Sequence, residues 1–221
     1  TVVPPPWAYP RNPDPVPGAP APAVDLDAPH RVPGSTKALS LRQIRNTFDI
    51  ADWHPEGHPP MPRIVSHGRG MEVRACGYCH YPNGKGRPEN AGLAGLPAAY
   101  IVQQMADIKS GARRSADPLM RPPALMVDVA KAANDEDVRV AAAYFASLPW
   151  TPWVRVVETD TVATFTVVGG MAVPIEGAGA GREPLGMRVI ELPDDPERAE
   201  VLRDDAASFT AYVPIGSVKT S

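Results

Sequence analysis

The sequence predicts a mainly α protein with a proline-rich N-terminal extension and a small β-rich C-terminal appendage. Two segments in the middle of the chain repeat apolar residues at helical spacing, and runs of β-branched residues follow them. Proline accounts for 28 of the 221 residues and is dense near the start of the chain. We therefore divide the chain into residues 1–35, 36–65, 66–150 and 151–221.

The first 35 residues contain Pro-Ala and Pro-Gly repeats, which prefer an extended polyproline conformation and cannot build a core. They suit a linker, a tether or a strap lying across the protein. Residues 36–65 form a transitional segment that we expect to pack on the region after it. A short helix is predicted there, with Ser35 or Ser40 near its start, from Leu39, Leu41, Ile44 and Phe48.

Residues 66–150 hold two predicted helices. The first has Pro97 in its opening turn, where a helix tolerates proline, and Gly111 as its C-terminal cap. Its repeating positions are Tyr100, Ile101, Gln104, Met105 and Ile108. The second begins at the N-cap Asn134, with acidic residues in the first turn, and stops at Pro149. Its apolar face consists of Val138, Ala141, Ala142, Phe145 and Leu148.

The chain changes character after Trp150-Thr151-Pro152-Trp153. Strands are predicted over 154–158, 161–168, 187–192 and 208–213. The acidic stretch 194–205 is expected to be a charged loop or short helix with a solvated face.

The chemistry of the chain is concentrated in Cys76-Gly77-Tyr78-Cys79-His80, which contains its only two cysteines. A C-x-x-C-H run is typical of c-type haem attachment. Each thiol can form a thioether to one haem vinyl group, and the next residue, His80, then lies where it can ligate the iron. Three other interpretations stay open: a thioredoxin-like redox pair, half of a zinc site, and a short structural disulfide. The trailing histidine favours haem over all three.

The sequence around this motif resembles class I cytochrome c over roughly residues 66–148. The resemblance rests on the glycine-rich turn 81–86, the Asn90 to Tyr100 stretch with its Gly-Leu-Pro, and the two helices described above. The most similar branch is the soluble bacterial two-domain (dihaem) cytochromes c. The resemblance implies one covalent haem c with its iron, and residues 151–221 resemble the segment that connects two such domains. A second C-x-x-C-H motif does not follow, so the chain is either a single-haem version or lacks its second domain.

The resemblance also implies a methionine ligand on the loop before the last helix. Met126 fits best, because its separation from Asn134 matches that of similar cytochromes, and Met120 is the alternative. Pro82 and Tyr100 are the further residues that the resemblance assigns to haem binding. Pro122 and Pro123 would stiffen the loop.

Three histidines compete for the second iron ligand: His54, His58 and His67. His54 and His58, with Glu56, also suggest a separate metal site. We expect none there, because the segment is extended and proline-rich and no other acid cluster lies near it in the sequence.

Composition bounds the partners and the location. The formal net charge is −3 and the pI is about 5.9, so no basic surface for nucleic acid is expected. No run of eighteen apolar residues predicts a transmembrane segment, and no signal peptide is visible. Since c-type haem attachment is completed outside the cytoplasm in similar proteins, the resemblance implies a mature periplasmic protein.

These observations predict an electron-transfer protein rather than an enzyme. Its redox protein partners would be a donor dehydrogenase or cytochrome and an acceptor oxidase or cytochrome. One alternative is an electron-transfer subunit of a periplasmic dehydrogenase complex. The other is a haem catalyst or gas-binding protein, which would need an open iron position.

Overall fold

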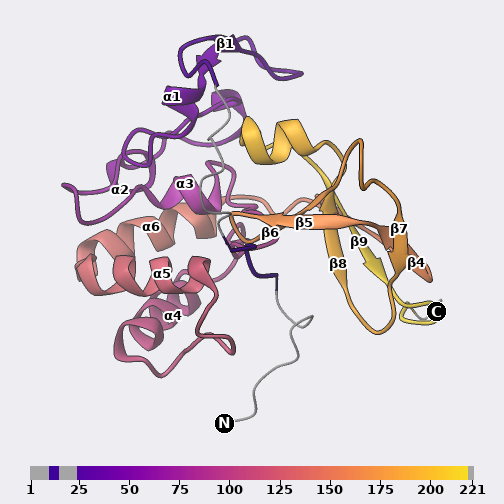
Figure 1. Cartoon of the computed structure of the whole chain (residues 1–221). Coiled ribbons are helices and arrows are strands. Elements are labelled where there is room, and N and C mark those ends of the chain that lie inside the picture. Colours follow the sequence, from indigo (N-terminus) through magenta and orange to yellow (C-terminus); the bar gives the residue numbers. More distant parts are fainter. Residues whose placement is uncertain (1–9, 15–23, 219–221) are drawn as a thin grey trace.

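The computed structural model describes residues 10–14 and 24–218. The helices between residues 76 and 147 gather on one side and the strands after residue 153 on the other, and the chain between residues 24 and 66, with its short strands, lies over the helical side (Figure 1). The expected polyproline conformation of residues 1–35 falls largely outside the described residues. Residues 10–14 behave as a strap, since Arg11 pairs with Asp117 at 2.5 Å and Asn12 accepts a hydrogen bond from the Gly170 amide.

The N-terminal segment forms a two-stranded hairpin and a short helix. Strand β1 (Pro29–His30) pairs antiparallel with β2 (Leu39–Ser40). Helix α1 (Leu41–Ile44) follows, and the Ser40 side chain caps it as predicted. A single 3-10 turn, η1 (Pro55–Gly57), interrupts the loop that comes after it.

The C-x-x-C-H motif itself forms the short helix α3 (Cys76–His80). Four further helices lie on the same side of the molecule (Figure 1): α2 (Arg63–Ser66), α4 (Ala98–Ser110), α5 (Arg121–Ala132) and α6 (Asp135–Ser147). Two sequence predictions are confirmed here: Gly111 ends α4 in the left-handed conformation, and Asn134 caps α6. The central cluster includes Ile101 from α4 and Ala142 and Phe145 from α6.

Helix α5 was not predicted. The segment was expected to be a loop stiffened by Pro122 and Pro123, but both prolines lie in the first turn of the helix, where their missing amides cost nothing. The residues that follow are good helix formers, so the helix continues to Ala132. A mainly α description therefore suits residues 63–147 and not the chain as a whole.

The C-terminal part is strand-rich, as predicted. Its strands are β3 (Val154–Glu158), β4 (Thr161–Ala163), β5 (Phe165–Val168), β6 (Met171–Pro174), β7 (Arg182–Pro184), β8 (Ile190–Pro193) and β9 (Phe209–Val213). Strand β9 lies between β3, which runs parallel to it, and β8, which runs antiparallel. The expected strand over 161–168 is divided at Thr164, and the one over 187–192 begins only at Ile190.

The charged stretch 194–205 agrees with its prediction in part. It contains a five-residue π-helix, η2 (Glu197–Val201), as the expected short helix, and Asp194, Asp195 and Glu197 are exposed. Asp204 is fully buried, and Leu202 joins Trp53 and Leu41 in a hydrophobic cluster. The expected solvated face therefore holds only for the first part of the stretch, because its last residues cover the N-terminal segment and the motif helix.

The motif helix is packed so closely that a side chain at Gly77 would force its neighbours to shift. A Cβ atom on Gly77 would lie 2.5 Å from the Ile50 Cδ1 atom and 3.0 Å from the Val65 carbonyl oxygen. The Ala75 amide also donates to the Thr47 carbonyl at 3.0 Å, which fixes the start of α3 against the N-terminal segment.

We predict that Gly77→Ala lowers the free energy of unfolding by about 1–3 kcal/mol, because the added methyl group overpacks this contact. Ile50→Val removes the clashing Cδ1 atom, so the double variant should recover part of the loss, while the Val65 carbonyl prevents full recovery. Denaturant unfolding of the four proteins measures the coupling. If the two changes add to within about 0.5 kcal/mol, Ile50 is not what excludes a side chain at position 77.

Candidate haem-attachment site

The two cysteines lie three residues apart on α3, which places both thiols on one side of the helix. Their sulfurs are not bonded to each other, so the disulfide interpretation is not supported. Burial raises the pKa of the Cys76 thiol to about 12 and also raises that of Cys79. Both are therefore protonated at neutral pH, unlike the low-pKa thiol on which a thioredoxin-like pair depends. Within residues 10–14 and 24–218, no set of acids or histidines groups with the thiols as zinc ligands would.

His80 is held in the form that can ligate iron. Its Nδ1 atom lies 2.8 Å from the carbonyl oxygen of Ala91, and since a carbonyl only accepts, Nδ1 carries the proton. The lone pair is therefore on Nε2. Burial lowers the pKa of His80, which keeps the imidazole neutral. The Phe145 ring packs edge to face with the imidazole, and the two ring centroids are 6.0 Å apart. Two unpaired thiols and an oriented neutral imidazole on one helix fit the attachment of a c-type haem.

The loop after His80 brings the Ala91 carbonyl into place. The Gly86 amide donates to the His80 carbonyl at 3.0 Å, and Gly86 has a φ of 71°. A side chain at position 86 would meet the Asn90 and Ala91 oxygens within 2.8 Å. Glycine there allows the two backbone segments to approach, which positions the hydrogen bond to His80. Pro82 is buried nearby, and its carbonyl accepts from the Tyr144 hydroxyl at 2.6 Å.

The two candidate methionines lie in different surroundings. Met126 is inside α5, so its expected place on a loop was wrong; the reason is that helix formers follow the two prolines. Met120 is the extended N-cap residue of α5, at the end of the loop. Asp117 anchors that loop, since its side chain accepts from the Leu119 amide and pairs with Arg11. Tyr100, in the first turn of α4, is 47% exposed.

The three competing histidines are each paired with a carboxylate. His54 lies 3.0 Å from Asp204 and His58 lies 3.2 Å from Asp52. For His58 the hydrogen bond to Asp52 raises the imidazole pKa, and its Nδ1 atom contacts the Pro59 carbonyl.

His67 is placed in a similar way between Ser66 and Asp49. With both nitrogens of His58 and of His67 engaged, the geometry gives these two residues no free atom for iron.

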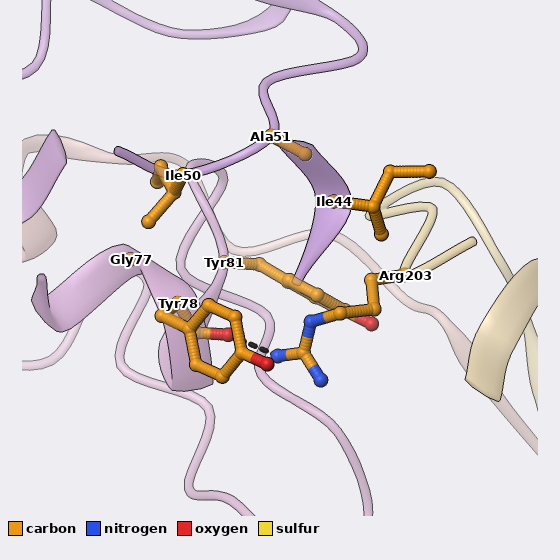
Figure 2. A pocket seen from close by; sticks show the side chains of 7 residues that line it. All are labelled: Ile44, Ile50, Ala51, Gly77, Tyr78, Tyr81 and Arg203. Atoms are coloured by element: carbon orange, nitrogen blue, oxygen red, sulfur yellow. Dashed lines mark hydrogen bonds between the residues drawn. The ribbon is translucent and has the colours of Figure 1, made fainter. Parts of the chain in front are cut away.

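The C-terminal segment contacts the motif helix through Arg203. Its guanidinium donates to the Tyr78 carbonyl and lies 4.0 Å from the centre of the Tyr78 ring and 5.8 Å from that of Tyr81 (Figure 2). Ile44, Ile50 and Ala51 line the other wall of the same small hollow. The Tyr81 hydroxyl also reaches the Ala199 carbonyl at 3.5 Å. These contacts make the C-terminal segment part of the site.

A buried ion pair lies in the loop that follows His80, and its arginine contacts the strands. Arg87 Nε lies 2.9 Å from Glu89 Oε1, and both side chains are less than 5% exposed. Arg87 also contacts the Met171 sulfur in β6, and burial raises the pKa of Glu89. Sequence reasoning missed Arg87 and Arg203 alike. Arg87 contacts Met171 in β6 and Arg203 contacts Tyr78 in α3, and since these contacts join remote segments, no local pattern marks them.

Comparison with known proteins gives a partial match. No protein-family model matches the chain. The chain is 36% identical over 132 residues to the thiosulfate dehydrogenase electron acceptor of Thiomonas intermedia (strain K12). The match covers 54% of this chain and 58% of that protein, so the chain spans less than two thirds of its relative's length.

Two solved structures are also similar in part. Cytochrome c4 of Acidithiobacillus ferrooxidans is 32% identical over 37% of this chain and 44% of its own, with a TM-score of 0.31. Reduced recombinant cytochrome c4 of Pseudomonas stutzeri is 29% identical over 37% and 43%, with a TM-score of 0.32. TM-scores this low do not establish a shared fold. The sequence similarity to the electron acceptor and the donor set on α3 together support the assignment of this chain as a cytochrome c.

Proposed function

We propose that this chain is a one-electron carrier whose haem is attached through Cys76 and Cys79 and ligated by His80. The observation that carries the proposal is the donor set of α3: two unpaired thiols on one side of the helix, and next to them a neutral imidazole whose Nδ1 is tied to Ala91. The similarity to a protein named as an electron acceptor supports the same function. The haem-binding region is proposed to span residues 66–150.

Each residue has a distinct task in this proposal. Cys76 and Cys79 would fix the group by two thioethers, and His80 would present Nε2 to the iron. When bound, the haem supplies a one-electron couple whose potential depends on its axial ligands. The Ala91 carbonyl holds the imidazole in one tautomer and orientation, and Arg203 holds the helix backbone at Tyr78. A carrier benefits from such rigidity, because ligands that do not move add little reorganisation to each transfer.

The second ligand is proposed to be a methionine. Met120 has the stronger support from its position, because it ends the loop that Asp117 anchors, whereas Met126 lies within a helix. In favour of Met126, its separation from Asn134 matches the separation of ligand and helix cap in similar cytochromes. A soft thioether on either residue would complete the His/Met pair that is typical of electron carriers.

The proposed location is the periplasm, and the proposed partners are redox proteins that meet the chain through a small transient interface. Within the described part of the chain, none of the helices has the length and apolar character needed to cross a membrane. The similarity to a thiosulfate dehydrogenase electron acceptor favours one role in particular, in which the chain accepts electrons from a dehydrogenase. A catalyst or gas-binding protein remains the alternative, and it would need a vacant iron position.

We predict that the haem remains on the chain in denaturing gels and after acid–acetone extraction, because thioethers survive both treatments. The variant Cys76→Ala/Cys79→Ala should lose all covalent haem. Asn83→Ala serves as the control, since Asn83 lies in the adjoining loop and offers no attachment atom. Complete extraction of haem from the native chain would rule out covalent attachment.

We predict that the ferric protein shows the weak long-wavelength charge-transfer band of methionine-ligated iron and that the reduced protein binds carbon monoxide poorly. Met120→Ala should abolish the band and open the iron to carbon monoxide, while Met126→Ala should preserve it. The reverse pattern assigns the ligand to Met126. Fast carbon monoxide binding by the unaltered chain would contradict the carrier function and favour a catalyst.

A further inference from the structure

A second group of potential ligands lies outside the proposed haem donors. His54 comes from the proline-rich loop, and Asp204 and Asp205 come from the C-terminal segment some 150 positions later. One donor atom from each residue lies within 4.8 Å of the other two. No metal was expected here because no acid cluster lies near His54 in the sequence, and the fold brings Asp204 and Asp205 to it from a distance.

Asp204 is fixed in one orientation. Arg198 donates to its Oδ2 atom from Nε at 2.8 Å and from Nη2 at 2.5 Å. Its Oδ1 atom faces His54 Nε2 at 3.0 Å and also accepts from the Ala206 amide at 2.9 Å. The side chain is completely buried. A cation would take over the contact between Oδ1 and His54, with Oδ1 and the imidazole both turned to the ion, while the far oxygen is paired with Arg198.

Asp205 provides the independent observation that points to a ligand. It is 4% exposed, and its Oδ1 atom has no hydrogen-bond partner within residues 10–14 and 24–218. A buried carboxylate oxygen without a partner is costly, and such groups are rare in folded proteins. Its backbone carbonyl is engaged, since it accepts from the Asn83 side chain at 2.7 Å. A cation beside His54 and Asp204 would satisfy the orphaned oxygen.

The donor types indicate which cation fits. Two carboxylates and one imidazole suit a first-row divalent metal such as Zn²⁺, which combines nitrogen and oxygen ligands. Calcium and magnesium prefer oxygen alone. Two carboxylates with Arg198 as the cation paired to one of them favour a positive ion at the cluster.

We propose that His54, Asp204 and Asp205 form a binding site for a divalent transition metal, with Zn²⁺ as its representative ion. The metal cross-links the proline-rich loop to the C-terminal segment. Through the hydrogen bond from Asn83 to Asp205, it also steadies the loop that follows the haem histidine. The site uses none of the proposed haem donors and does not depend on the proposed function.

The test is a titration of the full chain, isolated as produced and freed of metal with a chelator, using Zn²⁺ in a calorimeter. The unaltered chain should bind one equivalent, and binding should raise its thermal midpoint. Asp205→Asn keeps the shape of the side chain and should weaken binding at least about tenfold, as should His54→Gln. Asp49→Asn is the matched control, because it removes the acid of the exposed His67–Asp49 pair and should bind like the unaltered chain.

X-ray absorption of the Zn²⁺ complex should show nitrogen and oxygen neighbours without sulfur. If the unaltered chain binds less than one equivalent, or if Asp205→Asn binds as tightly as the control, the site is overturned and the ion is adventitious only. A sulfur shell would place the metal on the cysteines and overturn it as well. If His54→Gln does not fold, the affinity of Asp205→Asn for Zn²⁺ and the absorption spectrum still show whether the metal binds at this site.

Discussion

A helix of five residues is too short to be stable by itself, and α3 therefore exists only because its surroundings hold it. The N-terminal segment packs on one side, close enough that Gly77 admits no side chain. Arg203 holds the other side by stacking on Tyr78 and bonding its carbonyl. The donor atoms of Cys76 and Cys79 are placed by these contacts, so the geometry of the site depends on segments at both ends of the chain.

The sequence predicts well what depends on neighbouring residues. The cap of α6 at Asn134 and the end of α4 at Gly111 depend on short sequence patterns, and the structure confirms both. The C-x-x-C-H motif is equally local in the sequence, although the helix that it forms was not predicted. Helix α5 was missed because Pro122 and Pro123 were interpreted as loop residues, although the first turn of a helix accepts both.

Contacts between remote segments could not be predicted in the same way. The acids at 204 and 205 look like part of a solvated charged stretch until the fold brings them to His54, and only then does their burial become visible. Arg203 is similar, because nothing near it in the sequence marks Tyr78 as its partner. The C-terminal residues were expected to form an appendage, and in the structure Arg203 lines the hollow beside the motif helix.

The proposed function depends on one haem attached covalently to α3, which the mass of the intact chain would reveal. The chain should be produced in a bacterium that attaches c-type haem in its periplasm and then measured under denaturing conditions. We expect the sequence mass plus one haem, with the addition confined to the peptide that contains residues 76–80. The sequence mass alone, or a loss of two hydrogens from a Cys76–Cys79 disulfide, would contradict it.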